Sequence, residues 1–354
     1  MRAAVFHEPG KIVVTEVPVP RIEADEILLR VRAASICGTD LRISRHGHFK
    51  LPPGRPRILG HEVAGEVVEV GSRVSGHAVG DRVSLTPNVG CGRCSHCRAG
   101  LNNMCPDYEA FGITLDGGFQ EYLRVPGLAL QRGNVFRLPE TLSYTEAALV
   151  EPFSCCYRGQ RAVGVGYEDV VVIIGAGPIG AFHVMLARLA GAEKIIVSGH
   201  GGRRLEAAGR LGADVVVEVP RQDLAEVVAE QTGGRGADVV ITAASSPQVQ
   251  SEAVGLLATH GRLNFFAGLG RDGTVPLDVN ALHYKGLTLT GTTGSSNADY
   301  ARSLRLAGER RVRLDQLVTA AFPIERIDEA FEHAASGAGM KAMVVFDGDK
   351  EVLP

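Results

Sequence analysis

The stretch "DVVVIIGAGPIG", from Asp169 to Gly180, decides the fold of the second half of this sequence. Its first part is an unbroken apolar run, and Gly175, Gly177 and Gly180 follow directly in the pattern G-x-G-x-x-G. Between a buried strand and a helix, this pattern is typical of a turn that binds a dinucleotide. Gly175 would make the tight turn, Gly177 would let the backbone approach a pyrophosphate, and Gly180 would let the helix pack against the strand.

The same rhythm of apolar strand, turn and helix continues along the chain. We expect strands over 194–199, 214–219, 237–244, 261–268 and 287–293, and helices over 178–191, 203–212, 223–233 and 249–261. Nearly continuous Val and Ile runs that alternate with amphipathic helices are typical of a parallel sheet covered on both faces. The sequence therefore predicts a doubly wound α/β domain of about 130 residues, which is a normal domain size.

The end of the second strand of this domain bears on the identity of the dinucleotide. The phosphates are expected at the helix N-terminus, where free N–H groups favour negative charge. The expected binding loop is Gly175, Gly177, Pro178, Ile179 and Gly180. At the strand end, Gly199 and His200 stand where NAD-binding proteins place an acidic residue, and Arg203 and Arg204 follow within one turn. This arrangement favours NADP(H); the alternative is NAD(H) bound without the usual acid, with both arginines as solvated helix charges.

The first 150 residues do not show this alternation of strands and helices. Short Val-rich segments at 26–37, 62–71, 80–85 and 119–125, separated by Gly and Pro, predict a β-rich domain. The whole chain of 354 residues is long enough for two domains, and its net charge of -3 gives no electrostatic reason to expect nucleic acid or an anionic membrane as partner. The N-terminus lacks the pattern of a signal peptide, so the sequence predicts a cytoplasmic protein.

Four of the seven cysteines lie close together, in the pattern Cys91-x2-Cys94-x2-Cys97-x7-Cys105. In a reducing compartment such spacing favours metal ligands over disulfides. Four thiolates with no other ligand make a closed, structural zinc site. The alternative is four incidental buried thiols. Cys155 and Cys156 have no partner pattern and are interpreted as buried thiols.

Candidate ligands for a second metal are scattered along the chain. They are Cys37 in "SICGTD", His61 and Glu62 in "LGHEVAG", and Glu151 in "VEPFS". A cysteine, a histidine and a carboxylate with one open position would make a catalytic zinc site. Taken singly, each has a structural alternative as a core, turn, surface or helix-cap residue, and spacing alone does not exclude these alternatives.

With "CGTD", "GHE", the four-cysteine segment and the G-x-G-x-x-G turn in this order, the chain resembles the zinc-dependent medium-chain alcohol and polyol dehydrogenases over essentially its whole length. The resemblance implies a GroES-like catalytic domain over 1–150 that carries both zinc sites. It further implies a Rossmann domain over 151–285, and a segment 286–354 that completes the Rossmann sheet and returns to the first domain. It also implies a homo-oligomer, either dimer or tetramer.

The same resemblance implies roles for individual residues. Cys37 and His61 would ligate a catalytic zinc together with Glu62 or Glu151, and Thr39 would begin a proton relay. Asp40 would orient the ligand histidine. Lys341 would meet the coenzyme pyrophosphate, the alternative being an exposed lysine. With two zinc ions and NADP(H), the expected activity is hydride transfer between the coenzyme and a secondary alcohol or ketone.

The substrate is the least determined part. We expect a small hydroxylated molecule such as a polyol, sugar alcohol, cyclitol or sugar phosphate. Polar side chains suited to it are expected at His46, His48, Lys50 and Thr114, with Phe111 and the loop 291–297 as further candidates. The alternatives are an NAD-dependent threonine-type or simple alcohol dehydrogenase, and a non-catalytic NADP(H)-binding module.

Overall fold

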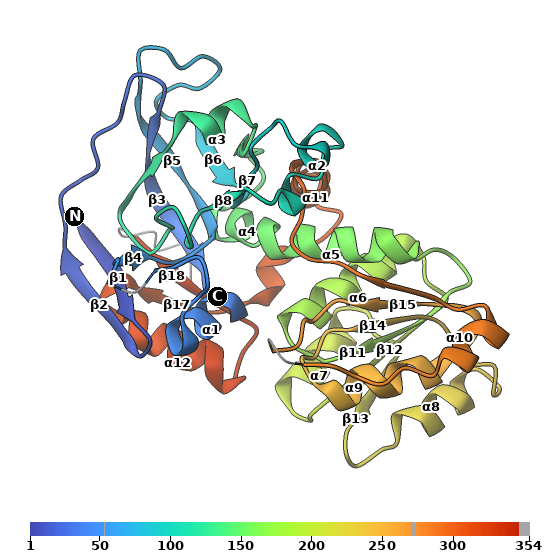
Figure 1. Ribbon diagram of the computed structural model, residues 1–354. Helices are drawn as coiled ribbons and strands as arrows, with labels where there is room; N and C mark the ends of the chain where they lie inside the picture. The colour runs from blue at the N-terminus through green and yellow to red at the C-terminus, as the bar shows by residue number, and fades with distance from the viewer. Residues whose placement is uncertain (53, 271–272, 347–354) are drawn as a thin grey trace. The chain divides into compact units, whose positions relative to one another are not determined.

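A computed structural model describes residues 1–52, 54–270 and 273–346, and it divides into two compact units (Figure 1). Unit 1 comprises Met1–Ser154 and the segment that begins at Ser295, and unit 2 comprises Cys155–Gly294. The first boundary falls inside a helix, α5 (Val150–Val163), whose sequence has no break there. The chain therefore leaves unit 1 and returns to it.

Unit 2 contains a six-stranded parallel sheet with the order β13-β12-β11-β14-β15-β16. Numbered from the first strand of the unit, this is the order 3-2-1-4-5-6 of a dinucleotide-binding fold. The predicted doubly wound α/β domain is thus confirmed. Its strands are β11 (Val170–Ile174), β12 (Lys194–Gly199), β13 (Val215–Glu218), β14 (Ala237–Thr242), β15 (Leu257–Phe265) and β16 (Thr288–Gly291). Its helices are α6 (Pro178–Ala190), α7 (Arg203–Arg210), α8 (Leu224–Gln231), α9 (Pro247–Glu252) and α10 (Val279–Lys285).

The central strand β11 is buried on both faces, which explains its unbroken apolar sequence. Val171 and Ile173 belong to a core cluster with residues of α6 and α7, such as Val184 and Leu205. The alternate residues of β11 belong to a second cluster with residues of α8 and the 3-10 helix Ala253–Leu256. Helices accordingly cover both faces of this sheet (Figure 1).

One predicted element of unit 2 is wrong in part. The helix expected over 249–261 ends as α9 at Glu252, and β15 already begins at Leu257. Leu257 pairs with Ala237 of β14, and an irregularity separates this pair from the next one. His260, inside β15, has a φ of 61°. Pairing with β14 outweighs the helical propensity of this segment. In the sheet, backbone groups of β14 form hydrogen bonds with β15 that they would lack if this segment were a helix.

Unit 1 is β-rich, as predicted. A seven-stranded sheet has the order β10-β6-β5-β3-β18-β17, with β9 also paired to β3, and smaller sheets are β2-β1-β4 and β7-β8. Its strands are β1 (Arg2–Glu8), β2 (Lys11–Glu16), β3 (Ile27–Ser35), β4 (Arg57–Ile58), β5 (Glu62–Val70), β6 (Arg82–Leu85), β7 (Asn88–Val89), β8 (Glu109–Ala110), β9 (Tyr122–Val125), β10 (Val135–Arg137), β17 (Val318–Pro323) and β18 (Lys341–Val345). Its helices are α1 (Gly38–His46), α2 (Ser95–Arg98), α3 (Gly127–Gln131), α4 (Tyr144–Ala148), α11 (Asn297–Gly308) and α12 (Ile327–Ser336).

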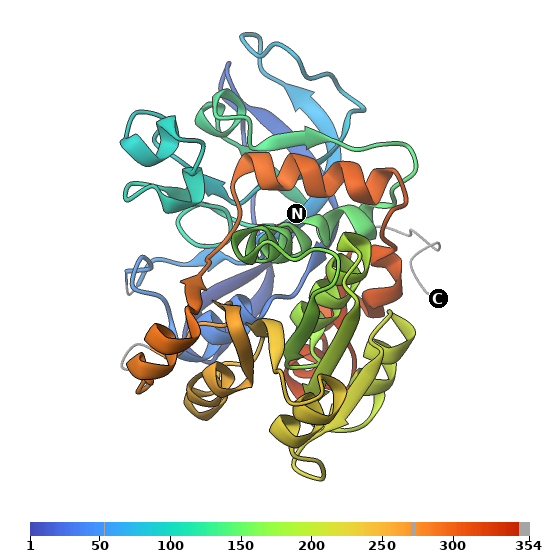
Figure 2. The same cartoon turned by 90° about the vertical axis from the view of Figure 1, so that its right-hand side faces the viewer.

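The returning segment is fixed to unit 1 by α11, which Figure 2 shows in orange beside strands of the N-terminal part of the chain. The Ser296 hydroxyl accepts from the Asp299 N–H and caps this helix. Tyr300 is fully buried, and its hydroxyl lies 2.7 Å from Ser84 Oγ of β6. In the part of the chain that the structure describes, no helix has the length and apolar character needed to cross a bilayer.

Candidate metal and dinucleotide sites

Three predicted metal ligands, Cys37, His61 and Glu62, meet in unit 1. One ligand atom from each lies within 4.8 Å of the others. Strand pairing explains the meeting, because Ser35 at the end of β3 is paired with Glu62 at the start of β5. Cys37 lies two residues after the end of β3 and His61 directly precedes β5, so residues distant in sequence come together at one end of the antiparallel pair.

Asp40 holds the two ligand-bearing segments in place from a fully buried position. Its carboxylate accepts from the Cys37 N–H at 3.0 Å and from the Gly60 N–H at 3.3 Å. The same carboxylate lies 3.3 Å from His61 Nδ1. A carboxylate on Nδ1 leaves Nε2 as the metal-binding nitrogen, which is how metal sites commonly fix their histidine. The predicted orienting role of Asp40 fits this geometry.

Neighbouring charged groups shift the pKa of His61. Burial lowers the pKa of His61, but the charges of Asp40 and Cys37 outweigh burial and raise it well above its usual value. The histidine therefore lies beside the Asp40 carboxylate and the Cys37 sulfur. These two groups suit a cation.

Glu62 is fully buried and both of its oxygens accept from the Lys341 ammonium, at 2.7 and 3.0 Å. Lys341 also donates to the Ile36 carbonyl at 2.9 Å and is only 4% exposed, so the alternative of an exposed lysine is wrong. Sheet register explains the contact, because β18 pairs with β3 on the side opposite β5. Burial lowers the pKa of Lys341, but Glu62 and Cys37 outweigh it, and the net pKa is raised.

Glu151, the other carboxylate considered as a ligand, is not part of the cluster defined by mutual ligand distances below 4.8 Å. It lies in the first turn of α5 and is 6% exposed. Thr39 is placed close to the cluster by sequence, two residues after Cys37 in the first turn of α1. Its hydroxyl accepts from the Arg42 guanidinium at 3.5 Å.

The chemistry of this cluster fits zinc. Tetrahedral zinc, with Zn–N about 2.0 Å and Zn–S about 2.3 Å, separates its ligand atoms by roughly 3.3 to 3.8 Å. A thiolate, an imidazole and a carboxylate within 4.8 Å of one another can close to that geometry with small side-chain movements. Three protein ligands leave one position for a substrate oxygen, as catalytic zinc sites do.

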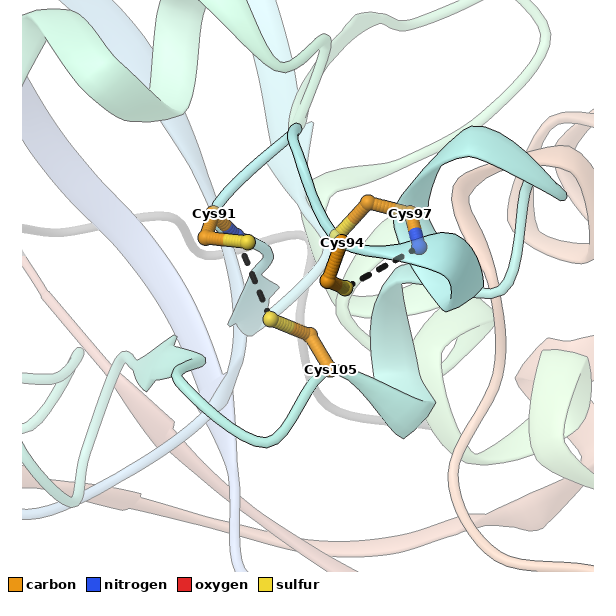
Figure 3. A group of neighbouring side chains, drawn as sticks. All are labelled: Cys91, Cys94, Cys97 and Cys105. Carbon is orange, nitrogen blue, oxygen red and sulfur yellow. Dashed lines mark hydrogen bonds between the residues drawn. The ribbon is translucent and has the colours of Figure 1, made fainter.

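The four clustered cysteines also converge, with sulfur atoms within 4.8 Å of one another (Figure 3). Backbone N–H groups point to this cluster: Cys91 N lies 3.3 Å from Cys105 Sγ, and Cys97 N lies 3.4 Å from Cys94 Sγ. Backbone N–H groups at Arg93 and Cys94 lower the pKa of Cys91 to about 6, whereas burial raises the pKa of Cys97 to about 12 and also raises that of Cys105. All seven cysteines are free of disulfides, and this set fits a closed four-thiolate zinc site.

The predicted dinucleotide turn is formed in unit 2 between β11 and α6. A Cβ on Gly180 would lie 1.9 Å from the Gly175 carbonyl oxygen, and Gly175 has a φ of 119°. Pro178 occupies the first turn of α6 and Gly177 is its N-cap. Ile179 lies one residue further along the helix. Gly175 and Gly180 are therefore required by backbone conformation or by a close approach, whereas a Cβ on Gly177 would meet only an ordinary contact, 3.8 Å from Arg204 Nη1.

The residues expected to choose the coenzyme lie near this turn. Gly199 ends β12, and a Cβ there would lie 2.8 Å from the Ala176 side chain. Arg204 is half-buried, with its Nη1 3.8 Å from the Cβ position of Gly177. His200 and Arg203 are exposed. The Glu218 carboxylate lies beside Gly201, where it is paired with Arg221 at 3.0 Å.

Several residues that were expected to contact substrate instead make contacts within the protein. Phe111 is 1% exposed and belongs to the core of unit 1, so its expected position at a substrate site is wrong. The Thr114 hydroxyl accepts from the Ala110 N–H at 2.7 Å within its own turn. In the loop 291–297, Ser295 accepts from the buried Ser154 hydroxyl, and Asn297 donates to the carbonyls of Arg132 and Gly133. Cys156 is buried as expected, whereas Cys155 is only partly buried.

Arg42 is a neighbour of Thr39 that sequence reasoning missed. It lies three positions after Thr39 on α1, and this spacing places two side chains on the same helix face. The three-residue spacing could have indicated that Arg42 lies near Thr39. Only the structure shows that the two side chains are in contact.

Comparison with known proteins matches both halves of the chain to families. Residues 23–134 match the family described as "Alcohol dehydrogenase GroES-like domain", and residues 178–309 match "Zinc-binding dehydrogenase". The chain is 35% identical over 336 residues to a sorbitol dehydrogenase of Bacillus subtilis (strain 168), covering 94% of this chain and 93% of that protein. It is 31% identical over 350 residues to a D-arabitol-phosphate dehydrogenase of Enterococcus avium, covering 97% of both.

A solved structure from Sinorhizobium meliloti 1021, described as a zinc-binding dehydrogenase bound to NADP, matches with a TM-score of 0.90 and 31% identity. The match covers 98% of this chain and 99% of that one. Fold and sequence therefore agree along nearly the whole length.

Proposed function

The chain belongs to the zinc-dependent medium-chain alcohol and polyol dehydrogenase family, and from this we propose that it oxidises a secondary alcohol of a polyol, or reduces the corresponding ketone, with a nicotinamide coenzyme. The observation that carries the proposal is the convergence of Cys37, His61 and Glu62 in one chain with a dinucleotide turn. A protein that used this fold only to bind NADP(H), without catalysis, would not need this set of ligand residues.

We assign Cys37, His61 and Glu62 as the residues that would hold the catalytic zinc, with Glu151 as the carboxylate that does not bind directly. When bound, zinc supplies a Lewis acid that lowers the pKa of a substrate hydroxyl or polarises a carbonyl. Asp40 keeps the imidazole of His61 in position, and Lys341 neutralises Glu62. The second zinc would bind the four cysteines and support the fold.

Thr39 is the residue that we assign to proton transfer. A guanidinium has donors only, so Thr39 Oγ1 accepts from Arg42 and its own proton remains free for donation. The threonine hydroxyl can then accept the proton that the substrate hydroxyl loses while it donates its own proton onward. Because this step only moves protons, hydride transfer to the coenzyme is a separate event on the carbinol carbon.

NADP(H) is the coenzyme that we favour. The end of β12 has no carboxylate, and Arg204 lies half-buried beside the glycine turn with Arg203 adjacent. Glu218, the acid near Gly201, is paired with Arg221 and so presents less negative charge to a 2′-phosphate. The NADP-bound Sinorhizobium meliloti protein supports the same choice.

Replacing Arg203 and Arg204 together with alanine is expected to weaken NADP(H) binding about 10- to 100-fold, with a much smaller effect on NAD(H). The physical reason is the loss of charge-assisted hydrogen bonds to the 2′-phosphate. Fluorescence titration of the reduced coenzymes measures both affinities. Arg210→Ala, at an exposed position of the same helix, is the matched control. Equal losses for the two coenzymes would remove the case for NADP(H).

Zinc analysis combined with a substrate screen tests the function. We expect two zinc ions per chain, and reduction of coenzyme by at least one polyol, cyclitol or sugar phosphate, followed by nicotinamide absorbance. One zinc per chain and no turnover with any of these alcohols would favour a binding module instead.

A further inference from the structure

A group of basic side chains extends from the relay threonine along α1 and the loop that follows it. Arg42 Nη2 lies 3.5 Å from Thr39 Oγ1. Arg42 and Lys50 both lower the pKa of His48 through their charges, after the larger effect of burial. The Lys50 backbone N–H donates to His48 Nδ1 at 3.2 Å, and Arg42 on α1 precedes both residues in the chain. We refer to Arg42, His48 and Lys50 as the basic cluster.

Lys50 is held in a fixed position. Its ammonium donates to the Tyr108 carbonyl at 2.9 Å and lies 3.4 Å from the centroid of the Tyr108 ring. These two contacts leave at least one N–H donor of the ammonium group for another partner. A lysine anchored in this way loses little side-chain entropy when it binds an anion.

His48 is oriented as a donor. Its Nδ1 accepts from the Lys50 N–H at 3.2 Å, so in the neutral ring the proton is on Nε2. Burial and the two cations lower its pKa, which keeps the ring neutral near pH 7. The cluster therefore offers a guanidinium, an ammonium and one neutral N–H.

The positive charges of the cluster have no negative partner within residues 1–52, 54–270 and 273–346. Arg42 contacts Thr39 there, Lys50 contacts Tyr108, and neither has a carboxylate oxygen within 4.0 Å. Other arginines of unit 1 behave differently; for example, Arg2, Arg57 and Arg137 pair with acids. Positive charges without a negative partner repel each other, and an external anion would relieve that repulsion.

We propose that the basic cluster binds a phosphate monoester on the substrate, so that the substrate is a phosphorylated polyol. This rests on the proposed function and narrows it. Two cations match the charge of -1.5 to -2 that a phosphate monoester carries near pH 7, whereas a carboxylate would neutralise only one. Arg42 contacts the Thr39 hydroxyl, so an anion bound to Arg42 would lie beside the group that we assign to proton transfer.

The test compares D-arabitol with its 5-phosphate on the zinc-loaded, full-length enzyme at saturating coenzyme. We expect the wild-type kcat/KM for the phosphate ester to exceed that for the free polyol. In Arg42→Ala and in Lys50→Met, the ratio of the two kcat/KM values is expected to fall about 10- to 100-fold, as for loss of one hydrogen-bonded charge. Arg45→Ala, an exposed position on the same helix, is the matched control and should keep the ratio.

A second measurement does not require turnover. Calorimetric titration of the coenzyme-saturated enzyme with inorganic phosphate should show binding that weakens at least 10-fold in Arg42→Ala, and not in Arg45→Ala. If D-arabitol or another free polyol reacts but its phosphate ester is not preferred, and phosphate does not bind, the inference is wrong while the dehydrogenase function stands. A preference for sugar acids over phosphate esters would also overturn it. Phosphate binding that depends on Arg42, without turnover of any alcohol, would support the anion site and contradict the dehydrogenase function.

Discussion

Cys37→Ser is expected to lower turnover by on the order of 10³-fold or more while coenzyme binding persists. Zinc contributes several kcal/mol of charge stabilisation to such reactions, which corresponds to a rate factor of this size. Serine at pH 7 is a neutral hydroxyl and a poor zinc ligand compared with a thiolate. Because Asp40 holds the Cys37 N–H rather than its side chain, the local backbone should keep its conformation.

Cys94→Ser is the matched control, since it makes the same chemical change in the other thiolate group. Each variant should contain one zinc ion per chain by elemental analysis, but Cys94→Ser should mainly lose thermal stability and keep measurable turnover. Wild-type activity in Cys37→Ser would contradict the catalytic assignment. Loss of coenzyme affinity in Cys37→Ser would indicate a general folding defect instead.

Lys341→Met is expected to destabilise the metal-free protein by about 3 to 5 kcal/mol. Lys341 and Glu62 form an ion pair with side-chain exposures of 5% and 0%, and removing the ammonium leaves a buried carboxylate without its cation. Methionine retains the apolar stem of lysine, so the loss would report the charge rather than a cavity. Urea denaturation of metal-free wild-type and variant proteins measures the change.

The double variant Glu62→Gln with Lys341→Met provides the control. It removes both charges, so it should recover much of the stability that the single variant loses. If Lys341→Met alone unfolds at the wild-type urea concentration, the ion pair contributes little and the buried carboxylate must have another partner. Lys341→Arg should be close to wild type if positive charge is the requirement.

Local sequence was sufficient for the dinucleotide-binding unit. A run of β-branched residues buried on both faces, followed by glycines that a tight turn demands, depends on interactions within a few residues. The four cysteines were recognisable for a similar reason, because their spacing alone brings thiolates to one centre. The segment 249–261 was not predictable in this way, because pairing with β14 converted its second half to a strand.

The metal cluster shows what sequence leaves open. Cys37, His61, Glu62 and Glu151 were all candidates, and only the pairing of β3 with β5 selects the first three. Lys341 lies 279 residues from Glu62, and its role depends on β18 pairing with β3 on the opposite side. The contact between Arg42 and Thr39 likewise needed side-chain positions.

The sequence by itself determined the class of the protein: a parallel α/β unit with a dinucleotide turn, a β-rich unit and a set of four cysteines at metal-ligand spacing. These features follow from the periodicity and spacing of residues that lie close together in the sequence. The tertiary structure decided which carboxylate lies with the cysteine and the histidine, and which lysine pairs with that carboxylate. Those choices depend on strand register between segments far apart in the chain, and register is fixed only when the whole sheet forms.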